Sequence, residues 1–475
     1  MNILLVRAKP TFMDMILGIP IGLAMIGAVV DRLKQHHVEI LDLALERSTE
    51  AAEQKLRDKM AGGRRYDLVG LTCMTVEYEP ACRAAQLIKA IDPSVRTVFG
   101  GQHPTIRTEE VIKNDFCDFV VIGEGEETFL DLVVALERGG NFTSVFGLAF
   151  TANGQAQINP PRPSIMDLDA LPFPAYHLLD VEAYFRLEAA RYTPKNKRCL
   201  QIFTSRGCPW RCTYCHDLFG KKFRARTAEN VLEEIRLLYH QYGIRELMVE
   251  DDIFNLDMER AKKICDLIIA SEMKLYLQFG NGLRLERFDE ELVRKLAQAG
   301  THHIAIAIES ASPRIQKLIK KNLRLDKTME VFSWLRKHKI NSLGFFMIGF
   351  PFETKEEIEQ TIQYARQTDL DEALFSIVVP YSGTELNQYV QEQGLFDPDS
   401  ASRGGGSIAL IKSPNFDFST LKKLQRKAYF TFFSSKFRFI RMLPKLFNIH
   451  SAWKYLRAIE RNFLAYGGDA SSRIN

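Results

Sequence analysis

Three cysteines are spaced so that one loop could hold a metal cluster. Cys208, Cys212 and Cys215 form a C-x₃-C-x₂-C pattern in a segment that also contains glycine and proline. Thiolates at this spacing can bind one face of a cubane iron–sulfur cluster, whereas electron-carrier clusters use four cysteines. With three cysteine ligands, one iron keeps an open coordination position. An open position lets a metal centre do chemistry on a bound molecule.

Three other sites could be built from some of the same residues. A Cys₃His zinc site could use His216, although zinc ligands usually come as two separated pairs and His216 directly follows Cys215. The C-x-x-C-H pattern that begins at Cys212 matches haem attachment, which would require an exported protein. A four-cysteine electron-transfer cluster could recruit Cys199 or Cys265.

The segments around the cysteines alternate between strand and helix patterns. The helix expected at 228–242 has apolar residues at helical spacing, with Thr227 as its N-cap. Six strand–helix units predict a partial parallel (β/α)₆ barrel of the TIM type, in which catalytic groups lie at the carboxyl ends of the strands. The strands are expected at residues 200–204, 246–250, 275–279, 303–308, 342–348 and 373–379.

Polar residues and glycines recur where these strands end. Because the carboxyl ends of parallel strands meet at one edge, we expect these residues to line one site. Acidic residues at such positions also serve as helix caps, so each one alone is a weak indication. The candidates are Glu250, Asp251, Arg284, Glu309, Ser310, Ile348 and Gly349.

The N-terminal third predicts a second α/β unit, with a Rossmann-like parallel sheet covered by helices on both faces. Its short apolar runs lie at 3–6, 38–41, 68–72, 97–99 and 119–122. The first βα turn lacks the G-x-G-x-x-G pattern, which argues against a dinucleotide. Small and polar residues follow the third, fourth and fifth runs, where such sheets bind ligands, although tight turns would explain any one of these loops. The candidates are Thr72, Thr75, Gly100, Gly101, Gln102, His103, Gly123, Glu124, Gly125 and Glu126.

Two further segments differ from the rest of the chain in composition. Five prolines between Pro160 and Pro174 predict a linker. After three glycines at 404–406, residues 421–475 contain 12 Lys+Arg, 2 Asp+Glu and many aromatic residues. This tail is expected to be a helical cap on the barrel, with contact to a membrane surface or an acidic ligand as the alternative. The predicted domains are therefore 1–150, a linker at 151–196, a barrel at 197–400 and a helical C-terminal region at 401–475.

The bulk composition is that of a globular protein, with 46% hydrophobic and 26% charged residues in 475. Eight scattered cysteines favour reduced thiols and a cytoplasmic location over a disulfide framework. The uncharged apolar run at 15–30 contains Pro20 and is short for a membrane span. Asp14 and Asp31 flank it, which argues against a signal peptide. The net charge of +4 is small, and no nucleic-acid-binding motif is recognised.

The cysteine pattern, with an aromatic residue just before the third cysteine, resembles the signature of the radical S-adenosylmethionine (SAM) superfamily. Residues 1–150 resemble the cobalamin-binding domain found at the N-terminus of many such enzymes. The G-G-x-H-P turn that begins at Gly100 and the D-F-V-V-I-G-E-G-E-E-T segment at 118–128 carry this resemblance. The D-x-H-x-x-G motif is absent from residues 1–150. The resemblance therefore implies a cobalt without a histidine ligand from the protein, and a loop role for His103.

The resemblance implies three cofactors. Cys208, Cys212 and Cys215 would bind a [4Fe–4S] cluster whose fourth iron chelates SAM, and Tyr214 would lie near the adenine. The strand-end candidates of the barrel would surround SAM, with a carboxylate at Glu250 or Asp251 accepting its ammonium group. The candidates of the N-terminal third would surround cobalamin.

The implied activity is radical C-methylation. SAM would be split to a 5′-deoxyadenosyl radical, and methylcobalamin would methylate an unactivated carbon of a small-molecule, lipid or peptide substrate. A flavodoxin or ferredoxin would supply electrons. The same cofactors could instead serve cyclisation, ring rearrangement or oxidation. An iron–sulfur redox sensor and a zinc-structured binding protein are the alternatives outside this class.

Overall fold

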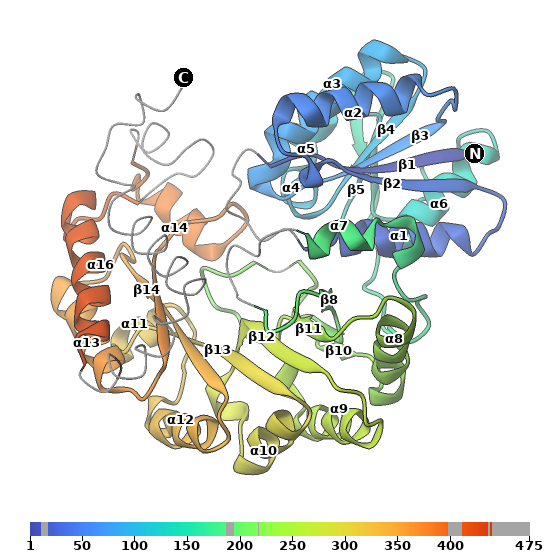
Figure 1. Cartoon of the computed structure of the whole chain (residues 1–475). Coiled ribbons are helices and arrows are strands. Elements are labelled where there is room, and N and C mark those ends of the chain that lie inside the picture. Colours follow the sequence, from blue (N-terminus) through green and yellow to red (C-terminus); the bar gives the residue numbers. More distant parts are fainter. Residues whose placement is uncertain (11–17, 187–193, 217, 398–410, 436–437, 439–475) are drawn as a thin grey trace. The chain divides into compact units, whose positions relative to one another are not determined.

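The computed structural model of the chain describes residues 1–10, 18–186, 194–216, 218–397, 411–435 and 438 (Figure 1). The chain divides into two compact units, and the division passes through the loop that carries the cysteines. The first unit comprises Met1–Pro209, Asp217–Gly280 and Gln298–Thr301. The second comprises Trp210–His216, Asn281–Ala297 and His302–Asn475.

In the part of the chain that the structure describes, the first unit begins with a seven-stranded sheet of order β2-β1-β3-β4-β5-β6-β7. Strands β1 to β5 are parallel, and β6 and β7 add an antiparallel hairpin. Because the strand order reverses at β1, the sheet has a topological switch point between β1 and β3, where folds of this kind bind ligands. The strands are β1 (Asn2–Arg7), β2 (His37–Asp42), β3 (Leu68–Thr72), β4 (Arg96–Gly100), β5 (Phe119–Val121), β6 (Leu148–Ala152) and β7 (Gln155–Ile158).

Helices cover both faces of this sheet (Figure 1). Helices α1 (Ile21–Asp31) and α6 (Gly125–Glu137) pack together on one face, and α2 (Thr49–Ala61) and α3 (Tyr78–Ile91) pack together on the other. Strands β1 and β3 are buried over most of their length. Covering both faces explains why these strands are continuous apolar runs instead of alternating ones.

A second sheet, counted over the described residues, has six strands in the order β15-β14-β13-β12-β11-β8. This order follows the chain, and the pairs from β8 to β12 and from β13 to β15 are parallel. The strands are β8 (Cys199–Ile202), β11 (Glu246–Val249), β12 (Tyr276–Leu283), β13 (Thr301–Glu309), β14 (Asn341–Ile348) and β15 (Glu372–Ile377).

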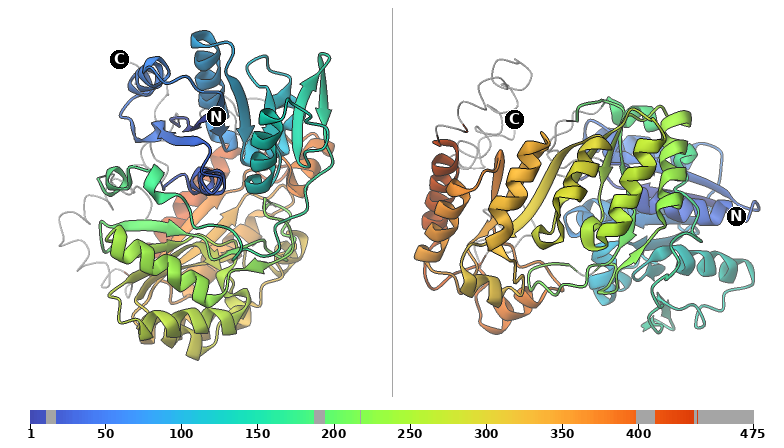
Figure 2. Two further views of the ribbon diagram at one scale, coloured as in Figure 1. Left: turned by 90° about the vertical axis from the view of Figure 1, so that its right-hand side faces the viewer. Right: turned by 90° about the horizontal axis from the view of Figure 1, so that it is seen from below.

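Helices follow these strands in turn, as in a partial (β/α)₆ barrel. In the first unit α8 and α9 lie side by side (Figure 2). The oxygen of Thr227 caps α8 by accepting a hydrogen bond from the Asn230 amide, as expected from the sequence. The helices are α8 (Ala228–Gln241), α9 (Met258–Ala270), α10 (Glu290–Gln298), α11 (Pro313–Leu318), α12 (Thr328–Lys337), α13 (Lys355–Gln367) and α14 (Glu385–Glu392).

Helix α16 (Phe418–Phe433) covers β15 and packs against α13. The hydroxyl of Tyr429 accepts a hydrogen bond from the Phe375 amide at 3.2 Å, and Phe432 is fully buried. This helix accounts for the beginning of the expected C-terminal cap. Residues 436–437 and 439–475 lie outside the described residues, so the alternative of a membrane-surface contact stays a prediction.

The predicted fold class is confirmed, and the expected strands occur within a few residues of their predicted positions. The β6–β7 hairpin was not predicted from the sequence. Its turn contains Asn153 and Gly154, both with positive φ, and an Asn-Gly pair between two strands is the strongest short-range signal for a hairpin. Among the described helices, none is both long enough and apolar enough to cross a bilayer.

Candidate active site

The loop with the cysteines begins at the carboxyl end of β8, where two aspartates hold it. The carboxylate of Asp251 accepts hydrogen bonds from the Thr204 amide at 2.6 Å, the Thr204 hydroxyl at 2.5 Å and the Ser205 hydroxyl at 2.6 Å. The carboxylate of Asp252 accepts one from the Gly207 amide at 2.9 Å. These bonds use both oxygens of Asp251 and fix the backbone directly before Cys208.

A short hairpin continues this support. Strands β9 (Ser205–Arg206) and β10 (Arg224–Ala225) pair in antiparallel fashion, and the Cys208 amide donates to the Gly220 carbonyl at 3.3 Å. Gly207 has a φ of +83°, and a Cβ on it would lie 2.3 Å from the Lys222 carbonyl oxygen. Only glycine fits at this position, immediately before the first cysteine.

The rest of the cysteine loop belongs to the second unit, where backbone bonds hold it on two sides. The Thr213 amide donates to the Ile319 carbonyl at 3.1 Å, and the Leu386 amide donates to the Thr213 carbonyl at 2.8 Å. The Cys212 sulfur lies 4.0 Å from the Lys320 carbonyl oxygen. The buried Thr213 hydroxyl has no hydrogen-bond partner among the described residues.

No disulfide joins any of the eight cysteines, all of which are described. No three His, Cys, Asp or Glu side chains in the described residues gather as ligands of one metal ion. In a cubane cluster each of the three thiolates binds a different iron, so the three sulfur atoms do not have to lie within reach of one common metal ion. The Cys199 sulfur accepts a hydrogen bond from Gln278 at 3.7 Å, and burial raises its pKa to about 12. Cys199 begins β8, whereas the cysteine loop follows the other end of that strand.

Tyr214, Glu309 and Lys321 form a connected group beside the loop. Glu309 ends β13 with a φ of +68°, at a point where the register with β14 shifts by a bulge. Such strain in a residue other than glycine is concentrated at functional sites. The Lys321 ammonium lies 3.3 Å from the Glu309 carboxylate, and both side chains are buried. Burial and the neighbouring Glu309 raise the pKa of Tyr214 well above its usual value.

Arg284 lies against the same loop. Its guanidinium stacks on the Trp210 ring at 4.1 Å, donates to the Lys321 carbonyl at 2.6 Å and pairs with Glu286 at 3.1 Å. Ser310 is fully buried, and its hydroxyl lies 3.3 Å from that of Thr361. The backbone around Lys321 therefore connects Arg284, Glu309 and the cysteine loop, which the sequence did not indicate.

The segment after β14 carries a buried acid, Glu353, that was not predicted from the sequence. Ile348 and Gly349 lie there, and Gly349 has a φ of +93°. The Glu353 carboxylate accepts hydrogen bonds from the amides of Gly349 at 2.7 Å and Phe350 at 3.2 Å. Its other oxygen has no partner among the described residues, and burial raises the pKa of Glu353 to about 8. Tyr214 contacts Phe350 edge-on at 5.9 Å, which connects this segment with the cysteine loop.

The N-terminal candidates that follow β3 and β4 are brought together beside the switch point. The Cys73 amide donates to the Gly100 carbonyl, and the His103 amide donates to the Cys73 carbonyl. A Cβ on Gly101 would lie 2.9 Å from the Thr72 hydroxyl oxygen, and the φ of Gly101 is +99°. His103 stacks on Tyr78 at 4.0 Å, and its Nδ1 lies 3.3 Å from the Thr75 hydroxyl.

The imidazole of His103 is buried, and burial lowers its pKa. Its Nε2 is buried without a hydrogen-bond partner among the described residues. Thr75 lies within reach of the same ring. A buried polar atom without a partner is uncommon in native proteins, and a bound group at the ligand-binding edge of the sheet would supply the partner.

The loop after β5 contains two glycines, Gly123 and Gly125, and two glutamates, Glu124 and Glu126. Gly123 has a φ of +78°, and a Cβ on it would meet no atom within 4 Å, so its backbone faces open space. Glu124 and Glu126 are engaged elsewhere. Glu124 accepts hydrogen bonds from Arg206 and Arg224, and Glu126 accepts one from Arg206. Neither arginine was predicted from the sequence as a partner of these glutamates.

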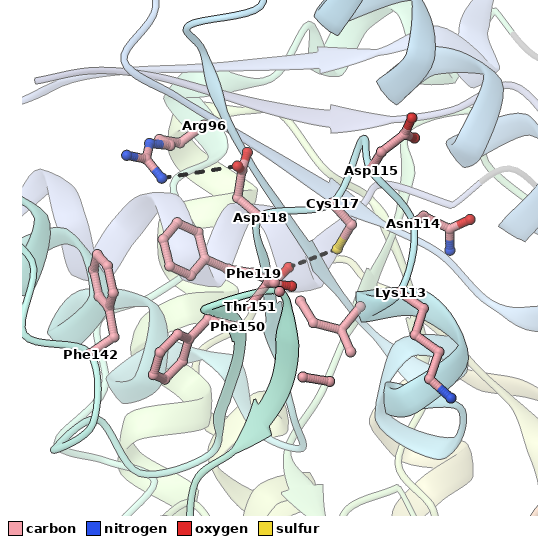
Figure 3. A pocket seen from close by; sticks show the side chains of 13 residues that line it. Arg96, Lys113, Asn114, Asp115, Cys117, Asp118, Phe119, Phe142, Phe150 and Thr151 are labelled. Atoms are coloured by element: carbon pink, nitrogen blue, oxygen red, sulfur yellow. Dashed lines mark hydrogen bonds and ion pairs between the residues drawn. The ribbon is translucent and has the colours of Figure 1, made fainter.

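A cavity of about 330 Å³ lies at the opposite, amino-terminal edge of the same sheet (Figure 3). Arg96 and Asp118 form an ion pair at 4.0 Å beside it, and Phe119 begins β5 there. Cys117 is also in its wall and bonds to the Phe119 carbonyl. This cavity is separate from the candidate residues, all of which lie at the carboxyl ends of the strands.

The residues present fit the groups that the sequence pattern implies. The cysteine loop supplies three thiols, a soft donor set that suits iron–sulfur clusters, and it is held by Asp251, Asp252 and Ile319. The Thr213 hydroxyl and the Glu353 oxygen are buried without partners among the described residues. At the N-terminal sheet, the open backbone at Gly123 and the unpartnered Nε2 of His103 suit a bound cofactor at the switch point.

Two family models match the chain. The radical SAM superfamily matches residues 202–365, and the B12 binding domain matches residues 17–133. An uncharacterised methyltransferase of Pyrococcus horikoshii is 35% identical over 419 residues, which cover 88% of each chain. The cytidylyl-2-hydroxyethylphosphonate methyltransferase of Streptomyces wedmorensis is 30% identical over 80% of this chain and 79% of its own.

Two further similarities are more distant. The anaerobic magnesium-protoporphyrin IX monomethyl ester cyclase of Rubrivivax gelatinosus is 27% identical over 75% of this chain and 66% of its own. Among solved structures, the radical SAM methyltransferase TsrM of Kitasatospora setae, with cobalamin and a [4Fe–4S] cluster bound, has a TM-score of 0.74 at 19% identity. The match covers 90% of each chain, and at this identity it establishes the fold.

Proposed function

The chain belongs to the radical SAM enzymes that carry a B12-binding domain, and we propose that it methylates an unactivated carbon of a small-molecule substrate. Its cofactors are a [4Fe–4S] cluster, SAM and cobalamin. The observation that carries the proposal is the three-cysteine loop in one chain with a B12-type sheet. The 35% and 30% identical relatives are both named as methyltransferases.

Bound together, the cofactors would supply a hydrogen-abstracting radical and a methyl donor. In net terms, one SAM becomes methionine and 5′-deoxyadenosine while the substrate loses a hydrogen atom. A second SAM gives its methyl group and becomes S-adenosylhomocysteine, and an external reductant such as a flavodoxin or ferredoxin supplies two electrons. This balance distinguishes methylation from a reaction that consumes one SAM.

We assign the residues around the cysteine loop to positioning and binding. Cys208, Cys212 and Cys215 are assigned as cluster ligands. Tyr214 and Glu309 would contact SAM, and Lys321 would hold the Glu309 carboxylate, which it meets at 3.3 Å. Among the remaining assignments, Arg284 would keep Trp210 over the loop, and Glu250, Ser310, Ile348 and Gly349 would line the SAM site. Asp251 would act through the backbone before Cys208.

We assign the N-terminal loops to cobalamin. Thr72, Gly100, Gly101 and Gly123 would allow the cofactor to approach the backbone, and the unpartnered Nε2 of His103 would face it. Thr75, Gln102 and Gly125 are assigned to the same surface. We also propose a cytoplasmic location, because reduced thiols and a cluster require a reducing compartment.

Cofactor analysis tests the proposal directly. The protein is purified without oxygen and reconstituted with iron, sulfide and hydroxocobalamin, then supplied with dithionite and SAM. We expect about four irons and one cobalamin per chain, and 5′-deoxyadenosine that is lost in Cys212→Ala. Cys265→Ala is the matched control and should retain both iron and product. Zinc without iron, or a cluster whose formation survives loss of Cys212, would refute the assignment.

Methyl transfer is tested with methyl-labelled SAM. We expect S-adenosylhomocysteine and 5′-deoxyadenosine in equal amounts and label in the product. Cyclisation is the second candidate, because the Rubrivivax relative is named as a cyclase. Product that forms with 5′-deoxyadenosine but without S-adenosylhomocysteine would favour cyclisation or oxidation. A tetrapyrrole and a nucleotide-linked phosphonate are the first substrates to screen, from the names of the relatives.

A further inference from the structure

A buried group of four charged side chains connects the loop after β5 with the β9–β10 hairpin, whose two strands flank the cysteines. The Glu124 carboxylate accepts hydrogen bonds from Arg206 at 2.9 Å and from Arg224 at 2.7 and 2.8 Å. Glu126 accepts one from Arg206 at 2.5 Å. The side chain of Arg224 is 1% exposed and that of Glu124 is 6% exposed. All four residues belong to the first unit, and we call them the arginine–glutamate network.

The two arginines lie so close together that their charges must be balanced by the glutamates. Arg206 and Arg224 are direct cross-strand partners in the β9–β10 hairpin. Like charges at such positions repel each other, and burial makes the repulsion stronger because the local dielectric constant is low. Glu124 contacts both guanidiniums, so its charge lets the hairpin close with both arginines buried.

The network also holds the linker at Ile165 and the connection between β9 and β10 at Phe219. The second oxygen of Glu124 accepts a hydrogen bond from the Ile165 amide at 2.9 Å, and Arg224 donates to the Ile165 carbonyl at 2.6 Å. Arg224 further donates to the Phe219 carbonyl at 2.7 Å. The two terminal nitrogens of Arg224 therefore bind Glu124, the linker at Ile165 and the segment that follows the cysteines, whereas its Nε has no hydrogen-bond partner among the described residues.

The two ends of the network lie in the two loops assigned to different cofactors. Glu124 stands between Gly123 and Gly125, in a loop assigned to cobalamin. Arg206 precedes Cys208 by two residues. We propose that the arginine–glutamate network is a positioning device that couples the two loops, so that filling one cofactor site tightens the other. The proposal rests on the cofactor assignments of the proposed function.

The coupling is measured as a ratio of dissociation constants. Hydroxocobalamin binding is followed by its absorbance, once with the apoprotein and once with the cluster reconstituted. We expect the cluster-loaded wild type to bind cobalamin at least about fivefold more tightly. In Arg224→Gln this ratio should fall to about one. Arg224 belongs to neither set of assigned cofactor residues, so its replacement tests the network and not a direct contact.

Two further variants separate coupling from a loss of folding. Glu124→Gln with Arg224→Gln removes one charge of each sign and leaves the Arg206–Glu126 pair. It should keep a cooperative melting transition and still show a ratio of about one. Glu127→Gln is the matched control. Glu127 lies next to Glu126 on α6 but pairs with Arg162 at the surface. It should keep the wild-type ratio.

Each outcome separates this proposal from the proposed function. A wild-type ratio of one, or a ratio retained in the folded double variant, would overturn the coupling while leaving the cofactors established. A wild type that takes up neither iron nor cobalamin would overturn the proposed function itself, and the coupling with it.

Discussion

At the scale of single residues, the second unit keeps two acids in opposite electrostatic settings. Burial raises the pKa of Glu353 to about 8, although two backbone amides donate to it. Glu357, four residues later, is held at a pKa of about 2 by its hydrogen bond with Arg314. The difference arises because Glu357 pairs with the Arg314 guanidinium and is partly exposed, whereas Glu353 accepts hydrogen bonds from backbone amides and is fully buried.

Glu353 should make stability depend on pH. Between about pH 4.5 and 8 the native state keeps the proton that the unfolded chain releases. The native state then binds more protons, so the free energy of unfolding falls as the pH rises through this window. Glu353→Gln, which never ionises, should show a flatter profile in urea unfolding midpoints from pH 5 to 8.5. Glu357→Gln is the control, and it should lower stability without flattening the slope. Parallel profiles of wild type and Glu353→Gln would contradict this.

Lys321 should matter mainly because Glu309 is buried. Lys321→Met leaves that carboxylate without its cation at 3.3 Å. Breaking a buried pair from one side costs roughly 3–5 kcal/mol, whereas replacing both partners costs much less. The double variant with Glu309→Gln should therefore recover most of the stability lost by Lys321→Met, as measured by denaturant unfolding. Losses that simply add would show that the pair is not coupled.

At the scale of elements, the carboxyl ends of the strands position the site, and short-range backbone constraints shape its loops. The two aspartates after β11 have a structural role. Their oxygens accept hydrogen bonds from Thr204, Ser205 and Gly207. The hairpin of β9 and β10 then fixes the chain on both sides of the cysteines.

Gly207→Ala should prevent this hairpin from closing and cause loss of the cluster. The added Cβ would lie 2.3 Å from the Lys222 carbonyl oxygen, and the backbone beside Cys208 would have to move. Gly220→Ala is the matched control. Its φ of +76° is equally strained, but its Cβ would have no neighbour closer than 3.9 Å. We expect the control to lose roughly 1–2 kcal/mol and keep its iron. Full iron content in Gly207→Ala would contradict the prediction.

At the scale of the whole molecule, the loops that we assign to the two cofactors are connected by residues from distant stretches of sequence. Arg206 and Glu124 are 82 residues apart, and Arg224 and Glu124 are 100 apart. A ligand that binds only the folded arrangement must stabilise it by mass action.

Hydroxocobalamin should therefore raise the melting temperature of the apoprotein. At one hundred times its dissociation constant it should add about 2.7 kcal/mol, enough for a shift of several degrees. Differential scanning fluorimetry checks this, with a titration to show that the shift grows with the logarithm of concentration. A melting temperature that does not move with cobalamin would contradict binding to the native state.

The sequence by itself determined what depends on local order along the chain. The spacing of Cys208, Cys212 and Cys215 indicated the cluster chemistry, and apolar runs located the strands of both sheets. Buried parallel strands and capped helices leave periodic patterns, so they can be read without knowing which elements meet. The Asn153-Gly154 turn was equally readable, and it was overlooked.

Only the tertiary structure decided which charges pair. Nothing in the sequence around Glu124 indicates Arg206 or Arg224, and nothing around Glu309 indicates Lys321 as its partner. A pairing of this kind depends on burial and on the approach of segments that are far apart in sequence. The free energy of a buried charge is set by its surroundings in space, and these exist only after the chain has folded.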